Sequence, residues 1–409
     1  GEATDYPQGV SVSNVPDMPQ PAVGDGSQTF FYTNQQSARL MFYHDHAWGI
    51  TRLNVYAGQA AGYVVTDAMD TSLFAADTDP VLAGNQPGLF PDLGVGTPLI
   101  VQDKTFVPNT ATMATSDPTW NYTKWGGEGN LWVPHVYMPA QNPGDPSGMS
   151  GFGRWMYGPW FWPPAKDVKY PPIPNPYYDA ACDPNVGMTN PIAPAVVGDP
   201  CEPALIPSTP NVSVGMEAFN DTPLVNGVAY PTTTVDPKAY RYRVLNAAND
   251  RFWNLSWYVA DPRTGTLSEV ALNPLELEAA QTDPNVSPTP DTTWSPKGPN
   301  WIQIGSEGGF LPMPVVVPAQ PTTWITDPTR FDVGNVDQHS LLLAPAERAD
   351  VIVDFSQYRG KTLILYNDAP AAFPARVPGY DYYTGGPDLA PSGAPTTLPG
   401  YGPNTRTVM

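Results

Sequence analysis

The chain has 409 residues, a length that suggests two or three domains. Its 39 acidic and 19 basic side chains give a formal net charge of -20, which excludes nucleic acid and anionic membrane surfaces as binding partners. The 52 prolines and 36 glycines exclude long helices and favour short strands joined by turns, so the composition predicts an all-β protein with long loops.

The first predicted strands cover residues 29–32, 38–44 and 56–65, where apolar and aromatic residues lie between glycines. Residues 68–96 then mix Asp, Pro and Gly with short apolar pieces, which is typical of a linker between domains, and a further strand is predicted over 98–103. The first residues do not form a signal peptide, and no apolar run reaches the roughly 18–20 residues that span a bilayer. We therefore expect a chain that starts after processing or truncation and has no membrane span.

Residues 107–215 are loop-like and rich in Pro and Trp, which indicates a long insertion. They include the two cysteines, Cys182 and Cys201, for which a disulfide is the leading prediction and two separate buried thiols the alternative. Such a disulfide would stabilise the fold by about 3 kcal/mol and would indicate an oxidising compartment. Strand signals resume over 224–227, 240–245, 254–259, 301–304, 340–343, 351–355 and 362–366, and residues 406–409 resemble the opening of another strand. Their short spacing predicts a β-sandwich or Greek-key barrel.

Two of the four histidines stand close together, in the run Phe42-Tyr43-His44-Asp45-His46-Ala47-Trp48-Gly49. On a strand, residues i and i+2 project from the same face, so His44 and His46 could each hold one metal ion of a close pair. Imidazole suits copper, zinc, iron and nickel, so ligand type alone does not choose the metal. By itself a His-x-His pair is weak evidence of a metal site and is more often an ordinary solvent-facing or hydrogen-bonded pair. The other two, His135 and His339, are expected to be structural or solvated rather than ligands.

The surroundings of this pair are more specific. Residues 41–58 closely resemble the second copper motif of bacterial laccase-type multicopper oxidases, the group that contains spore-coat laccase and phenoxazinone synthase. Further runs resemble the second domain of the same family, at residues 221–231, 240–247, 302–312 and 343–350. Together the resemblance covers about two thirds of the chain. The resemblance implies tandem cupredoxin-like Greek-key β-sandwich domains.

The resemblance also implies a domain plan and a cofactor. Residues 1–75 would be the C-terminal part of domain one, 76–96 the linker, and 97–409 domain two with the insertion at about 107–215. Carried over from the family motif, His44 and His46 would each ligate one of the two paired (type 3) copper ions. No other cofactor and no catalytic side chain is predicted in this chain.

Several copper motifs of the family are absent from the sequence, including the earlier His-x-His, His-x-x-His-x-His and His-Cys-His with a downstream Met. We therefore expect the missing domains to lie outside this chain or on a separate chain. As part of an extracytoplasmic oxidase, it would couple one-electron oxidation of phenols or metal ions such as Mn(II) to the four-electron reduction of O₂ to water. The alternative is a non-catalytic cupredoxin-fold structural or assembly protein; a copper nitrite reductase fits worse, because its mononuclear-site cysteine should lie in the first domain.

Overall fold

The computed structural model describes residues 32–47, 51–75, 88–104, 222–280 and 288–369, the C-terminal residues 405–409, and short pieces between them at 106–107, 109–111, 122, 127–131, 173–174, 180–181, 205–206, 220, 286 and 373. The chain divides into two compact units, 1–37 and 38–409, and the helices and strands of the described residues belong to the second. None of the helices in the described ranges has the length and apolar character needed to cross a bilayer.

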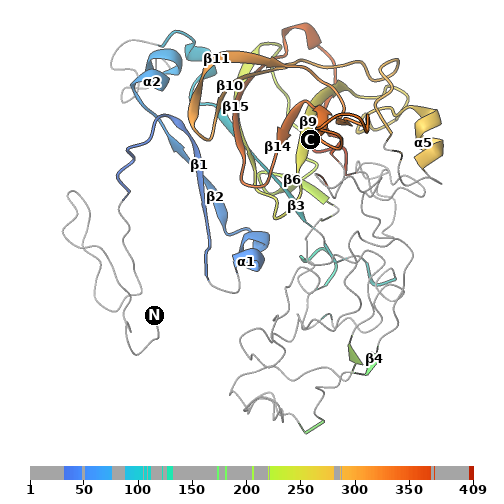
Figure 1. Cartoon of the computed structure of the whole chain (residues 1–409). Coiled ribbons are helices and arrows are strands. Elements are labelled where there is room, and N and C mark those ends of the chain that lie inside the picture. The colour runs from blue at the N-terminus through green and yellow to red at the C-terminus, as the bar shows by residue number, and fades with distance from the viewer. Residues whose placement is uncertain are drawn as a thin grey trace. The chain divides into compact units, whose positions relative to one another are not determined.

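The largest element is a seven-stranded sheet in the order β11-β10-β15-β8-β3-β6-β7 (Figure 1). Strand β3 runs parallel to β8, while the other neighbours pair antiparallel. A second sheet of three strands has the order β14-β9-β16. The strands of these two sheets are β3 (Thr97–Lys104), β6 (Thr222–Val225), β7 (Val228–Ala229), β8 (Ala239–Asn246), β9 (Trp253–Val259), β10 (Trp301–Ser306), β11 (Gly309–Val317), β14 (Leu341–Leu343), β15 (Arg348–Asp354) and β16 (Leu363–Asn367).

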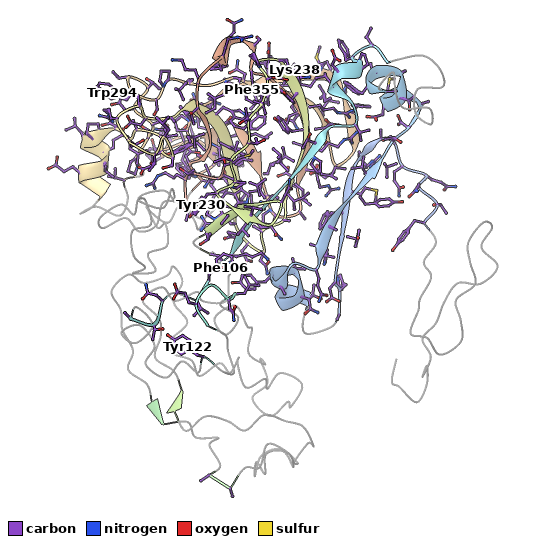
Figure 2. All side chains as sticks on the ribbon, turned by 180° about the vertical axis from the view of Figure 1, so that it is seen from behind. Phe106, Tyr122, Tyr230, Lys238, Trp294 and Phe355 are labelled. Atoms are coloured by element: carbon purple, nitrogen blue, oxygen red, sulfur yellow. The ribbon has the colours of Figure 1, made fainter. Side chains whose placement is uncertain are left out.

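The hydrophobic core lies between these two sheets. Val244 and Val351 come from the seven-stranded sheet, Leu255 and Leu365 come from the three-stranded sheet, and all four side chains are fully buried in one cluster. In Figure 2 the labelled Phe355 lies beside Lys238, whose carbonyl accepts its backbone N–H at 3.0 Å. Two sheets that pack face to face around one core form a sandwich. The predicted all-β, sandwich-like fold class is therefore confirmed.

The C-terminal residues extend the smaller sheet. Leu365 of β16 donates its N–H to the carbonyl of Met409 at 2.9 Å, and Val408 donates to the carbonyl of Leu365 at 2.9 Å. Val408 is fully buried in the core of the sandwich. The strand signal at 406–409 thus corresponds to a segment that pairs with β16.

The remaining elements are short. Strand β1 (Arg39–His44) pairs antiparallel with β2 (Ala60–Val65), with His44 opposite Ala60. The helices in the described ranges have seven residues or fewer, in keeping with the proline and glycine content. The helices and other short strands are α1 (Thr51–Ala57), α2 (Ala68–Phe74), η1 (Pro91–Leu93), β4 (Ile173–Pro174), β5 (Leu205–Ile206), α5 (Pro274–Ala280), β12 (Thr323–Trp324), β13 (Val336–Gln338) and η3 (Ser356–Tyr358).

Two elements correct the sequence prediction. The strand predicted over 56–65 begins only at Ala60, because Tyr56 belongs to α1, which is followed by Gly58 at φ +108°. Glycine adopts this positive φ without strain, so it separates the helix from the strand. The predicted linker at 68–96 begins with α2, whose N-cap Asp67 accepts the N–H of Asp70 at 2.8 Å. The domain boundaries themselves stay a prediction.

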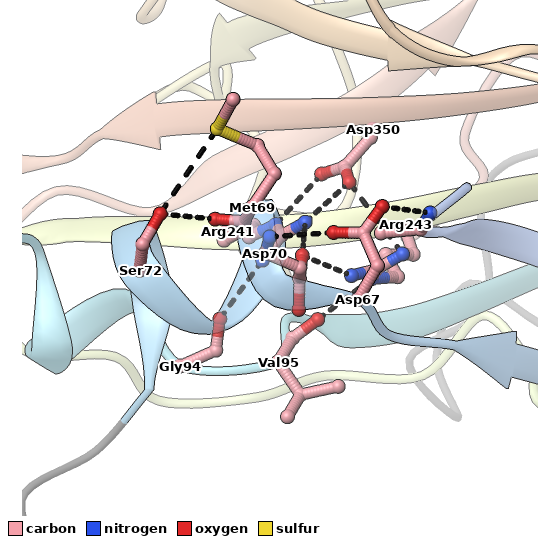
Figure 3. A network of polar contacts seen from close by, with 10 residues as sticks. Asp67, Met69, Asp70, Ser72, Gly94, Val95, Arg241, Arg243 and Asp350 are labelled. Carbon is pink, nitrogen blue, oxygen red and sulfur yellow. Dashed lines mark hydrogen bonds and ion pairs between the residues drawn. The ribbon is translucent and has the colours of Figure 1, made fainter. Parts of the chain in front are cut away.

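A buried ionic network joins α2 to the seven-stranded sheet (Figure 3). Arg241 of β8 donates from Nη2 to Asp70 of α2 at 2.8 Å and to Asp350 of β15 at 2.6 Å. Arg243 donates to the same Asp70 oxygen at 3.0 Å. The Arg241 guanidinium also lies over the ring of Phe74, 4.0 Å from its centroid. These contacts fix α2 against the sandwich and compensate charges that are out of reach of water.

A half-buried carboxyl group makes stability depend on pH. Asp368 accepts hydrogen bonds from the Asn254 side chain at 2.5 Å and the Thr322 N–H at 2.5 Å, and burial raises its pKa to about 6. The folded state therefore holds this proton at pH values where the unfolded state, with a pKa of 3.8, has lost it. The group's contribution to the free energy of unfolding falls as pH rises between about 4 and 6, by about 3 kcal/mol over the whole window.

We expect the variant Asp368→Asn to lose this part of the pH dependence, because an amide does not titrate. Urea unfolding at several pH values between 4 and 7 measures the slope of unfolding free energy against pH for both proteins. The comparison uses slopes because the amide nitrogen would face another donor, the Asn254 side chain, and changes the absolute stability as well. Equal slopes would show that Asp368 does not titrate in this range.

Candidate metal centre

The two histidines of the His-x-His run lie side by side. Strand β1 ends at His44, which is half-buried, and His46 is exposed two residues later. Their ring centroids are 5.6 Å apart with the planes at 30°, and the Phe42 ring stacks on the other side of His44 at 5.7 Å. The side chains therefore do not face opposite ways, and the geometry expected of adjacent imidazoles on one face is present. Their role as metal ligands stays a prediction.

The backbone determines which His44 nitrogen is available. Nδ1 of His44 lies 2.7 Å from the carbonyl oxygen of Asp45. Since a carbonyl only accepts, Nδ1 carries the proton and donates it. In the neutral ring the lone pair is then on Nε2, the nitrogen that can bind a metal ion.

The loop after β1 is tied to helix α1. One carboxylate oxygen of Asp45 accepts the backbone N–H of Ala47 at 3.0 Å and the side-chain amide of Asn54 at 2.9 Å. The hydroxyl of Thr51 donates to the carbonyl of Ala47 at 2.8 Å. The hydrogen bond from Asn54, followed by that from Ala47, holds the pKa of Asp45 below its usual value, so this carboxylate is charged in neutral solution.

A pocket of about 370 Å³ opens beside His44. Its walls come from β1, from α1 and from two turns of the sandwich, at residues 246–250 and 345–346. The lining is mixed, because apolar groups such as Phe42 and Val55 alternate with the polar side chains of His44, Asn246 and Asp250. The volume lies within the range of small-molecule sites in proteins.

Strand β1 is also bound to the sandwich. Arg348 of β15 donates from Nε to the carbonyl of Leu40 at 3.1 Å, and Arg39 donates to the carbonyl of Glu307 at 3.0 Å. Leu40 is buried in a cluster with Leu245 of β8. The run 343–350 is among the family-like runs in the sequence, but this contact of Arg348 joins residues 308 positions apart, and no local pattern indicates it.

The other candidate residues are not brought to this pair. His339 follows β13, donates from Nδ1 to the carbonyl of Ser340 at 2.8 Å, and does not line the pocket. Within the part of the chain that the structure describes, no group of three or more His, Cys, Asp or Glu side chains could hold a metal ion. His135, Cys182 and Cys201 lie outside the described residues, so the predicted disulfide stays a prediction.

Comparison with known proteins identifies relatives by sequence. No model of a protein family matches the chain. A protein named laccase from Bacillus subtilis is 25% identical over 342 residues, which is 84% of this chain and 36% of the relative. A laccase from Haloferax volcanii is 32% identical over 151 residues, which is 37% of this chain and 18% of the relative. The alignment with the Bacillus protein thus spans only about a third of that relative's length.

Among solved structures, the similarity to this chain is weaker than that of the sequence relatives. A multicopper oxidase from the hyperthermophile Aquifex aeolicus is 19% identical and has a TM-score of 0.35, over 81% of this chain and 37% of that protein.

Proposed function

Because this chain is a relative of the laccase-type multicopper oxidases, we propose that it forms part of an enzyme that couples one-electron oxidation of a small substrate to the reduction of dioxygen. Four substrate molecules each give up one electron, and O₂ takes up four electrons and four protons to form two water molecules. The observation that carries the proposal is the side-by-side arrangement of His44 and His46, 5.6 Å between ring centroids, in the run that resembles a copper motif.

The residues of the pair fit copper by their chemistry. Imidazole nitrogen is a good copper ligand, and His44 keeps Nε2 available because Nδ1 donates to Asp45. We propose that His44 and His46 each hold one ion of a copper pair. When bound, copper supplies the one-electron redox chemistry that carries electrons to dioxygen. The remaining copper ligands would come from domains outside this chain.

Two classes of substrate are compatible with the chain, phenols and metal ions such as Mn(II). The net charge of -20 attracts cations, which mildly favours metal ions over anionic organic molecules. The proposed domain plan keeps the boundaries 1–75, 76–96 and 97–409, with a missing cupredoxin domain in the same protein or on a separate chain. An extracytoplasmic location and a Cys182–Cys201 disulfide belong to the same proposal, because disulfides persist in oxidising compartments.

Expression of the complete gene product tests the proposal. We expect the purified protein to contain several copper ions per chain, to show the blue absorbance of a Cys-ligated mononuclear copper site, and to consume O₂ when a phenol or Mn(II) is added. A copper-free product that consumes no O₂ with either substrate class would instead support the non-catalytic scaffold. Copper without the absorbance would indicate a protein that lacks the mononuclear site.

A further inference from the structure

Asp45, the residue between the two histidines, makes several hydrogen bonds, although it is not itself one of the proposed metal ligands. One Asp45 oxygen accepts from both Ala47 and Asn54, at 3.0 and 2.9 Å. The Asp45 backbone N–H donates to the carbonyl of Gln59 at 3.1 Å, and the N–H of Gln59 donates to the carbonyl of Asn54 at 2.9 Å. Asp45 is thus connected to α1 twice, through its side chain and through the backbone after the helix.

Helix α1 is in turn anchored to the sandwich. Lys104 at the end of β3 is buried, and its ammonium donates to the carbonyl of Tyr56 in the last turn of α1. The same ammonium lies 5.3 Å from the centroid of the Tyr56 ring. A cation at the C-terminal end of a helix compensates carbonyls that have no partner within the helix. The helix that provides Asn54 therefore has a fixed place on the sandwich.

We propose that Asp45 and Asn54 are positioning residues that hold the two imidazoles side by side for metal binding. This inference rests on the proposed copper role of His44 and His46. His46 is exposed, and its ring contacts the His44 ring, so the position of each imidazole depends on the backbone that joins them. The link from Asp45 to α1 fixes the backbone between the two histidines and directly after His46, so less conformational freedom is lost when an ion binds.

Two substitutions separate the hydrogen bonds from the charge. In Asp45→Asn the amide oxygen can accept from both Ala47 and Asn54, because a single oxygen accepts both bonds in the native protein. Asp45→Ala removes both bonds. Asp327→Ala is the matched control. Asp327 accepts the N–H of Thr329, two residues later, at 2.9 Å, as Asp45 accepts that of Ala47, but it lies in an exposed loop that does not line the pocket.

The test measures copper affinity and imidazole state on the 409-residue chain. In titrations with Cu(I) against a chromophoric chelator, we expect Asp45→Ala to weaken binding about 10- to 100-fold, while Asp45→Asn and Asp327→Ala remain close to wild type. In metal-free protein with neutral imidazoles, ¹H–¹⁵N NMR should show a single His44 tautomer, protonated on Nδ1, in wild type and Asp45→Asn. A mixture is expected in Asp45→Ala.

Each outcome of the test supports or contradicts the positioning role of Asp45. If Asp45→Ala equals wild type in copper affinity and in tautomer, the positioning role is refuted. If Asp45→Asn is as weak as Asp45→Ala in copper affinity and its tautomer stays single, charge rather than the hydrogen bonds supports binding, and the proposal is likewise overturned. If wild type takes up no Cu(I), the proposed ligand pair fails, and the tautomer measurement alone then supports or refutes the positioning role.

Discussion

Replacing His44 with alanine in the complete gene product should abolish oxygen reduction. We expect the rate of O₂ consumption to fall more than about 100-fold, because even residues that only support a metal ligand typically change affinity or activity 10- to 100-fold. His46→Ala should have the same effect, since each ring would hold one ion of the pair. An oxygen electrode gives the rate, and copper quantification should show fewer ions per chain in both variants.

His339→Ala is the control for this experiment. His339 is exposed, makes the same kind of Nδ1 contact to the next carbonyl, and does not line the pocket, so its loss should leave both rate and copper content unchanged. Full activity and full copper content in His44→Ala would remove the basis for assigning the metal site to this run. An equal loss in all three variants would indicate a general effect on folding.

The second large effect is expected for Arg241→Met, which should lower the free energy of unfolding. Methionine keeps most of the side-chain volume but removes one of the two buried guanidiniums that contact Asp70 and Asp350, so that Arg243 alone faces both carboxylates. Removing one partner of a buried ion pair typically costs about 3–5 kcal/mol. The measurement is the midpoint of guanidinium chloride unfolding, with an unchanged slope against denaturant concentration as evidence that the same structure unfolds.

Arg330→Met provides the comparison for this change. Arg330 pairs with Asp332 at 2.7 Å, but both side chains are exposed and water screens the pair. Its midpoint should move far less than that of Arg241→Met. Equal shifts would mean that the Asp70–Arg241–Asp350 network contributes no more than a surface pair.

Much of the sandwich could be predicted from the sequence because its strands are short, apolar and separated by turn residues. The predicted strand at 240–245 corresponds to β8 (239–246), and that at 254–259 corresponds to β9 (253–259). Strand β11 was missed, because Pro312 and Pro314 are unfavourable in a central strand. They are tolerated here because β11 lies at the edge of the sheet, where one side needs no backbone partner.

The candidate site was predicted only in part, for a physical reason. The spacing of His44 and His46 is a local property of a strand, and the sequence displays it directly. The contacts that fix the pair come from elsewhere: Asn54 is nine residues from Asp45, and Lys104 is 48 residues from Tyr56. Such contacts depend on how α1 packs on β3, and neither periodicity nor composition determines that packing.

The interior place of β3 in the larger sheet, between β8 and β6, has a consequence for synthesis of the chain. Its sheet partners β6 and β8 come much later in the chain: Asn220, two residues before β6, donates its N–H to Asp103 of β3 from 117 positions away. At typical translation rates a ribosome needs roughly 6 to 23 seconds to make that stretch. Throughout this interval the apolar residues of β3 lack their native cover, so the nascent chain is open to aggregation, and slower growth at low temperature with ample chaperone should raise the soluble yield.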